Sequence, residues 1–362
     1  MFVRRCDLFA LVVGSLAAAT VGCTDGVGSQ QSYVVVDTQS EAAWAQYVAN
    51  VEFAQQYQPT CQPDPTSWRP RVLVTGFGRF MENRENATGR MVSLLVPGLE
   101  YPATEPPLPG QVDDPAAQTR VVLGVTSLPG VGDVDVCGLV LPVFWDLAAV
   151  LVLREAEVFE PDLVLMNGIA GSRQPLWLEL GSVNEAVALP DGSGVLEPVA
   201  PGAPLLDEAP PEERARGLLL SWQEVRAAAE ARIAALSTET GDAAAPFGDV
   251  VQGVRYAGFP RESNTYLCNN TTYVVGYVLD HAGETVRLLE PSAPRAGGPT
   301  GIDLTLGPDL SAVAREFVHW PKELSNGHLN RGADVMSRIM AAQLSATTDP
   351  VRGDPAMADF TE

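Results

Sequence analysis

The stretch "VDVCGLVLPVFWDLAAVLVLREAEVFEPDLVLMNGIAG", residues 134–171, decides the fold class. Its first part, 134–145, is apolar and rich in β-branched residues, which predicts a buried strand. Residues 146–159 predict a helix, and residues 161–171 predict a second strand that ends at a glycine turn. A strand, a helix and a strand in this order imply a parallel pair joined by a right-handed crossover. The chain is therefore expected to be an α/β protein.

The flanking segments extend this pattern. "RVLVTGFGRF" (71–80) predicts another buried strand followed by a glycine loop. Residues 24–37 are expected to be a tether, and the helix after it is expected to begin at the capping-box spacing of Thr38 and Glu41. Three stretches rich in proline, glycine and acidic residues are expected to be surface insertions: 102–119, 190–213 and 283–310.

The charge of the chain narrows the classes of partner. The 362 residues are 46% hydrophobic, which is enough for a sizeable core, and their formal net charge is -22. Such a surface repels a polyanion, so nucleic-acid binding is not expected.

The N-terminus predicts export. Arg4 and Arg5 precede an apolar run, 8–21, that leads through Gly22 to Cys23. This pattern resembles a bacterial lipoprotein signal, in which Cys23 is lipidated and becomes the new N-terminus. Plain secretion and a retained N-terminal anchor remain alternatives. We therefore expect an exported protein of the cell envelope that contacts the membrane through a lipid anchor only.

Five cysteines remain to be assigned. Cys6 leaves with the signal and Cys23 carries lipid or leaves too, so three thiols remain and cannot all pair. The simplest assignment in an oxidising compartment is a disulfide between Cys61 and Cys137, with Cys268 free. The alternative for a lone cysteine is a small buried hydrophobic residue.

The sequence gives little support for a metal site or a dinucleotide-binding site. The "GFG" at 76–78 would need a glycine at position 81 to form a dinucleotide loop, and Met81 stands there. The histidines and cysteines show no metal-binding spacing, so neither a metal nor a cofactor is expected.

Cys268 is a candidate nucleophile because residues 269–281 predict a helix that begins next to it. Unpaired amides at a helix N-terminus favour a thiolate and can donate to an oxyanion. His281 would lie about 20 Å away along that helix and cannot be the base. His319 ends a short strand before Pro321 and is the better candidate, whereas His328 lies in a polar turn and is expected to be solvated.

A carboxylate that orients the base completes this set of side chains. Glu179 stands among apolar neighbours in "QPLWLELGSVNEA", where a lone charge would be costly unless it were paired. The alternatives are a surface carboxylate for Glu179 and a buried histidine bonded to the backbone for His319.

Four segments, in order, resemble the pyroglutamyl peptidase I family of cysteine peptidases. They cover most of the chain between residues 71 and 340, outside the three insertions. The segments are "VTGFGRFMENRENATG" (74–89), "VLPVFW" with "PDLVLMNGIAGSRQPLWLELGSVNEA" (140–186), "SNTYLCNNTTY" (263–273) and "FVHWP" (317–321).

The resemblance implies a single three-layer α/β/α domain with a mixed, largely parallel sheet. It implies Cys268 as nucleophile, His319 as base and acid, and Glu179 as orienting carboxylate. The activity it implies is removal of an N-terminal pyroglutamyl residue from peptides through an acyl-enzyme, without a metal or cofactor. Four further residues would form the substrate pocket: Phe77, Phe80, Tyr266 and Ile169.

Several positions depart from the family's pattern. Ala188 and Gly192 stand where the family commonly has an arginine and an asparagine. Ser263 and Asn264 replace a small Ala-Gly pair, and Met81 stands at a common glycine position. These changes leave the shape of the pocket wall open.

The expected organisation of the chain is a signal at 1–23, a tether and helix at 24–70, the α/β domain at 71–345 and a tail at 346–362. Two other functions remain alternatives: a cysteine hydrolase for a different small acyl amide, and a noncatalytic lipoprotein that binds ligands in the same pocket.

Overall fold

The stretch that decides the fold class forms β5 (Gly132–Leu141), α4 (Leu147–Phe159) and β6 (Leu163–Ala170). The two strands are parallel, as expected, but they are not neighbours. The earlier strand β3 (Arg71–Phe77) lies between them and pairs in parallel with both. β3 is buried from Val72 to Phe77, which is typical of a central strand covered on both faces.

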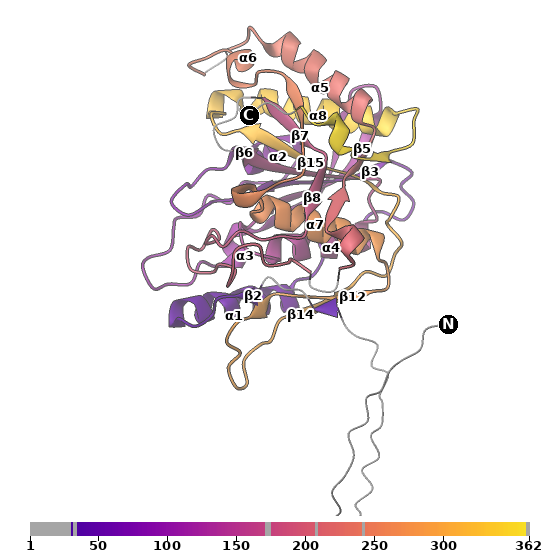
Figure 1. The fold of residues 1–362 in the computed structure, drawn as a ribbon. Helices are drawn as coiled ribbons and strands as arrows, with labels where there is room; N and C mark the ends of the chain where they lie inside the picture. Colours follow the sequence, from indigo (N-terminus) through magenta and orange to yellow (C-terminus); the bar gives the residue numbers. More distant parts are fainter. Residues whose placement is uncertain (1–29, 32–34, 171–174, 207–208, 241–242, 360–362) are drawn as a thin grey trace, which may run out of the picture.

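The structure is a computed structural model, and it describes residues 30–31, 35–170, 175–206, 209–240 and 243–359 (Figure 1). Its main sheet has the strand order β11-β7-β15-β6-β3-β5-β4, and β10 and β16 extend it beside β15. The pairs around β6 and β3 are parallel, whereas β4 and β7 each run antiparallel to a neighbour. The sheet is therefore mixed and largely parallel in its centre. The strands not yet bounded are β4 (Arg120–Leu128), β7 (Leu176–Glu179), β10 (Leu219–Leu220), β11 (Val254–Ala257), β15 (Ala314–Pro321) and β16 (Val351–Arg352).

Helices cover both faces of this sheet (Figure 1). One face carries α2 (Ala87–Leu95), α5 (Trp222–Leu236) and α8 (Leu329–Ser345), and α8 packs against both of the others. The other face carries α4 and α7 (Leu267–Asp280), with α1 (Glu41–Gln56) packed outside α4. The expected three-layer α/β/α arrangement is thus present. Short helices are α3 (Pro115–Gln118), α6 (Phe247–Val250) and the 3-10 turns η1 (Pro211–Glu213), η2 (Glu262–Asn264), η3 (Asn326–His328) and η4 (Pro355–Met357).

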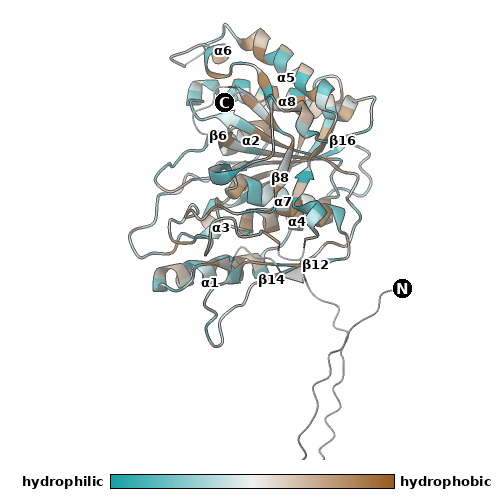
Figure 2. Ribbon diagram, viewed as in Figure 1, coloured by the Kyte–Doolittle hydropathy of each residue, from teal (hydrophilic) through white to brown (hydrophobic). Residues whose placement is uncertain are grey.

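The hydropathy of the helices agrees with this layering. In Figure 2, α1, α5 and α8 change between teal and brown along their length, as helices with one buried and one solvated face do. In contrast, α4 is buried from Leu147 to Leu153 because it lies between the sheet and α1. None of the helices in the described ranges is long and apolar enough to cross a bilayer.

The N-terminal helix begins differently from the expectation. Ser40, rather than Thr38, caps α1 by accepting a hydrogen bond from the amide of Ala43 at 3.1 Å. Thr38 is instead buried and accepts a hydrogen bond from Ala293 N through its Oγ1 at 3.1 Å. A long-range contact therefore takes Thr38 away from the cap.

The expected tether and the third insertion are structured together. β1 (Gln30–Gln31) pairs with β12 (Thr285–Leu288), which pairs in turn with β14 (Ile302–Thr305). β2 (Val35–Val36) pairs with β13 (Glu290–Pro291). This part of the chain is a small additional layer, in which residues expected to be a tether pair with strands of the third expected insertion.

A disulfide links the segment after α1 to the sheet. Cys61 follows α1 and is bonded to Cys137 at the centre of β5, with a Cα–Cα distance of 5.7 Å. The buried carboxylate of Glu155 accepts from the amides of Thr60 and Cys61 at 2.8 Å each. The segment after α1 is thereby held on the protein by a covalent bond and by hydrogen bonds.

Candidate active site

Cys268 lies at the N-terminus of α7, as the second residue of the helix after its N-cap Tyr266. The thiol is free. The first turn is held by Asn269, whose side-chain oxygen accepts from Val183 N at 2.8 Å and whose amide donates to the oxygens of Val183 and Glu185 at 2.9 Å each. The backbone amides at this end have no helical partners, so they present donors and the positive end of the dipole beside the sulfur.

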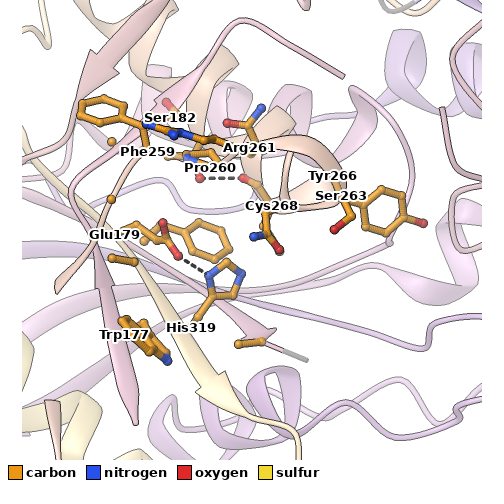
Figure 3. Close-up of a pocket in the computed structure, with 18 of the residues that line it drawn as sticks. Trp177, Glu179, Ser182, Phe259, Pro260, Arg261, Ser263, Tyr266, Cys268 and His319 are labelled. Carbon is orange, nitrogen blue, oxygen red and sulfur yellow. Dashed lines mark hydrogen bonds and ion pairs between the residues drawn. The ribbon is translucent and has the colours of Figure 1, made fainter. Parts of the chain in front are cut away.

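His319 and Glu179 meet across two antiparallel strands. His319 on β15 stands opposite Trp177 on β7, and Glu179 is the last residue of that strand. Glu179 Oε1 lies 2.6 Å from His319 Nδ1, as the dashed line in Figure 3 shows. Their side chains are only 14% and 20% exposed. The hydrogen bond on Nδ1 leaves the other ring nitrogen, Nε2, available to a reacting group.

The sulfur, the imidazole and the carboxylate form one continuous set. Burial alone would lower the pKa of His319, but the charge of the neighbouring Cys268 sulfur and the Glu179 carboxylate outweigh it and raise that pKa to about 10. The imidazole is therefore held in its protonated form at neutral pH. A protonated imidazole complements a thiolate and can donate a proton to a leaving group.

Gly168 on β6 provides the space for the sulfur, and the sequence reasoning did not single it out. Gly168 pairs with His319 in the register of β6 and β15. A Cβ atom at this position would lie 2.9 Å from Cys268 Sγ and 2.8 Å from the ring of Phe317. Only a residue without a side chain leaves the thiol in this place.

The three side chains line a cavity of about 430 Å³ (Figure 3). Of the four residues that the resemblance proposed for the substrate pocket, Tyr266 and Ile169 line it. Tyr266 is held by a hydrogen bond from its hydroxyl to the oxygen of Pro190 and by ring contacts with Trp145 and Phe80. The remaining walls include aromatic and loop residues that the sequence did not indicate: Trp177, Phe259, Pro260, Arg261 and Phe317.

The other two proposed pocket residues do not line the cavity. Phe77 is 4% exposed and packs in the core at the end of β3. Phe80 packs edge-on against Tyr266, with ring centroids 6.2 Å apart, and is not among the residues that line the cavity. The cavity is therefore lined without Phe77 and Phe80, which the resemblance had assigned to it.

The remaining histidines lie outside the cavity. His281 is at the far end of α7, where its ring stacks on Tyr277 with centroids 4.0 Å apart. His328 is 2% exposed, and its Nε2 lies 2.9 Å from the oxygen of Ala245, so the expectation of a solvated histidine was wrong. A long-range backbone partner from outside its polar turn explains the burial.

One group of described side chains is close enough to share a metal ion: Cys61, Cys137 and Glu155. The two sulfurs are joined to each other, and the carboxylate accepts hydrogen bonds from the backbone of the same segment. These contacts describe a structural cluster rather than a metal centre.

No protein-family model matches the chain, and no curated protein does. Solved pyroglutamyl peptidases are similar to it. Pyroglutamyl peptidase I from Bacillus amyloliquefaciens is 13% identical, with a TM-score of 0.44, over 75% of this chain and 97% of that chain. The pyrrolidone carboxyl peptidase from Thermococcus litoralis is 17% identical, with a TM-score of 0.45, over 76% and 93%. At these values the matches carry no argument for an activity, which has to come from the site.

Two departures from the family's pattern have a visible structural setting. Met81 has a φ of 49°, a left-handed conformation that favours glycine, and its oxygen accepts from Arg79 Nη1 at 2.8 Å. Gly192 donates to Val143 O at 2.7 Å, and a Cβ there would lie 2.8 Å from that same oxygen. The glycine at 192 is thus required by close contact with the segment after β5.

Proposed function

We propose that the chain is a cysteine peptidase that removes N-terminal pyroglutamate from peptides. The observation that carries the proposal is the site itself. A free thiol at a helix N-terminus lies beside an imidazole that a carboxylate orients, and all three line one cavity. This is the arrangement that acyl transfer through a thioester needs. The order of the four sequence segments that resemble pyroglutamyl peptidases supports the choice of acyl group.

In the proposed reaction the Cys268 thiolate attacks the acyl carbonyl carbon of the substrate, and a C–S bond forms. The oxyanion that develops faces the unpaired amides at the start of α7. His319 gives its proton to the nitrogen of the leaving peptide as the C–N bond breaks. The neutral imidazole then takes a proton from water, which attacks the thioester, and pyroglutamate leaves as the thiolate and the imidazolium are restored.

The cavity suits a small uncharged acyl group. Phe317 is almost fully buried, and Ile169 and Tyr266 add apolar surface next to the sulfur. A five-membered lactam can bury its ring against such walls, and loop backbone groups can meet its polar edge. Departures such as Ala188 leave room for a second candidate, a hydrolase for another small acyl amide.

The decisive test is hydrolysis of pyroglutamyl-aminocoumarin by the chain that lacks residues 1–23. We expect turnover that Cys268→Ala abolishes and that His281→Gln, at the other end of α7, leaves unchanged. A panel of acyl-aminocoumarins distinguishes this activity from the second candidate, because a hydrolase for another small acyl amide would favour a different acyl group. Slow alkylation of Cys268 near neutral pH, together with absence of turnover on the whole panel, would instead support a noncatalytic ligand-binding protein.

We further propose that the protein is exported and carries lipid on Cys23, so that it meets blocked peptides outside the cytoplasm. The support is the sequence of residues 1–23, which lies outside the described residues. Fractionation of cells that express the full chain tests this. The protein should be in the membrane fraction, and Cys23→Ala should release it or block its maturation.

A further inference from the structure

Arg261 is an arginine in the cavity wall that has no role in the proposed reaction. It lines the cavity together with its neighbours Phe259 and Pro260, and its side chain is exposed. Figure 3 draws these three residues together, on the opposite side of the Glu179–His319 pair from Trp177. A cation in this place needs an explanation, since the chain as a whole has a net charge of -22.

The carboxylates that share the cavity are already paired. Glu179 is bonded to His319, and Asp359 accepts from Tyr256 N at 3.0 Å and pairs with Arg226 at 3.2 Å. Within the described part of the chain, the guanidinium of Arg261 has no hydrogen bond or ion pair. Its donors are therefore open to solvent and to a group that enters the cavity.

Backbone hydrogen bonds fix the position from which the Arg261 side chain extends. Arg261 is the N-cap of the 3-10 turn η2, and its oxygen accepts from Asn264 N at 3.0 Å. Thr265 then bonds to the oxygen of Glu262 through both its amide and its hydroxyl, at 3.0 and 2.6 Å. The loop from Pro260 into α7 is thus a short, hydrogen-bonded connection, and it sets the position of Arg261 relative to Cys268.

The exposure of Arg261 indicates which part of a substrate it meets. The buried, apolar walls beside the sulfur suit the acyl group, as argued above. Arg261 belongs to the exposed loop that leads to the sulfur, so it faces the part of the substrate that continues toward solvent. In a peptidase of this type, that part is the leaving peptide.

We propose that Arg261 binds a carboxylate of the leaving peptide, so that the site prefers blocked peptides with a carboxylate directly beyond the scissile bond. This inference rests on the proposed function. A guanidinium pairs with a carboxylate through two parallel hydrogen bonds, which gives direction as well as attraction. The carboxylate is either the C-terminus of a pyroglutamyl dipeptide or the side chain of an acidic second residue.

The experiment compares kcat/KM for two matched pairs of substrates. One pair is pyroglutamyl-alanine and its C-terminal amide, and the other is pyroglutamyl-aspartate amide and pyroglutamyl-asparagine amide. In the unmodified protein we expect at least one carboxylate substrate to exceed its neutral partner by about tenfold, which corresponds to about 1.4 kcal/mol. The pair that shows the difference identifies the source of the carboxylate.

The variants isolate the contribution of Arg261. Arg261→Ala should abolish the ratio between partners, and Arg261→Lys should retain part of it because it keeps the charge without the planar fork. Arg214→Ala is the matched control, since Arg214 is an exposed arginine outside the cavity lining, and it should keep the full ratio. Added salt should reduce the preference.

Two results would overturn the inference while leaving the proposed function intact: equal kcat/KM within both pairs, or a ratio that persists in Arg261→Ala. Absence of hydrolysis of all four peptides and of neutral pyroglutamyl-aminocoumarin would overturn both proposals together.

Discussion

Replacing Gly168 by alanine tests whether the position of the sulfur, and not only its presence, supports activity. The added Cβ would lie 2.9 Å from Cys268 Sγ, whereas ordinary contacts begin at 3.4 Å, so the sulfur or the strand has to move by at least about 0.5 Å. A displacement of about 1 Å at a reacting centre costs about 100-fold in rate. We therefore expect kcat/KM for pyroglutamyl-aminocoumarin to fall about 10- to 100-fold, or about 1.4 to 2.7 kcal/mol.

The same substitution has a limited cost for folding. Overpacking in a well-packed core destabilises a protein by about 1 to 3 kcal/mol, so Gly168→Ala should still fold. Gly276→Ala is the matched control because it lies on α7, the helix of Cys268, and its Cβ would meet only Arg315 Nε at 4.0 Å. This control should keep full activity and gain up to about 1 kcal/mol from helix propensity.

The assay combines steady-state hydrolysis, the alkylation rate of Cys268 by iodoacetamide, and urea unfolding of each variant. A folded Gly168→Ala protein with unchanged kcat/KM and unchanged alkylation would refute the reasoning. It would mean that the sulfur does not rest against β6 in the reactive state.

Three other predictions concern charge and the disulfide. Because Cys268 and Glu179 raise the pKa of His319 to about 10, kcat/KM should fall at high pH only near that value. Glu179→Gln should move the basic limb of the pH–rate profile downward, toward the ordinary imidazole pKa of 6.5. A basic limb that stays in place would contradict the assignment of the Glu179–His319 pair. Burial raises the pKa of Glu316 to about 8 from 4.5, and neither carboxylate oxygen has a hydrogen-bond partner among the described residues. Ionisation of the unfolded chain therefore weakens the fold as pH rises between these values. In urea unfolding, Glu316→Gln should match the unmodified protein at pH 4.5 and exceed its unfolding free energy by up to about 3 kcal/mol at pH 7, and equal pH profiles would disprove this. Replacing both Cys61 and Cys137 by alanine should lower the unfolding free energy by about 4 kcal/mol, given the 76-residue separation, while Cys268 still reacts with iodoacetamide; an unchanged melting temperature would show that the bond is not formed.

The central features of the fold could be predicted because their signals are local. Apolar β-branched runs and the helix between two of them indicate an α/β sheet, and a cysteine before a helical segment indicates a helix N-terminus. The order of the strands was not accessible in the same way. β3 enters between β5 and β6, and this depends on packing between segments that are far apart in the chain.

The details of the site show the same division. Cys268, His319 and Glu179 could be named from residue type, strand ends and family motifs. Gly168 could not, because its role depends on a contact with a sulfur 100 positions later in the chain. Phe80 is a similar case, because it packs on Tyr266 from another segment and does not line the cavity.

Long-range partners also explain why two polar residues differ from the sequence-based expectation. Threonine is a residue type that often caps helices, but the hydroxyl of Thr38 accepts from Ala293 N, and Ser40 caps α1 instead. His328 lies in a turn of polar residues, yet Ala245 provides an acceptor that allows its burial. Local patterns predict which hydrogen bonds a residue can make, and the tertiary structure decides which partner it has.

The most direct test of the central claim is intact-mass spectrometry of the protein after rapid mixing with pyroglutamyl-aminocoumarin and acid quench. The account predicts a transient pyroglutamyl adduct that maps to the peptide containing Cys268 and is absent from Cys268→Ala. Turnover of the substrate that Cys268→Ala retains, or an adduct on any other residue, would contradict it.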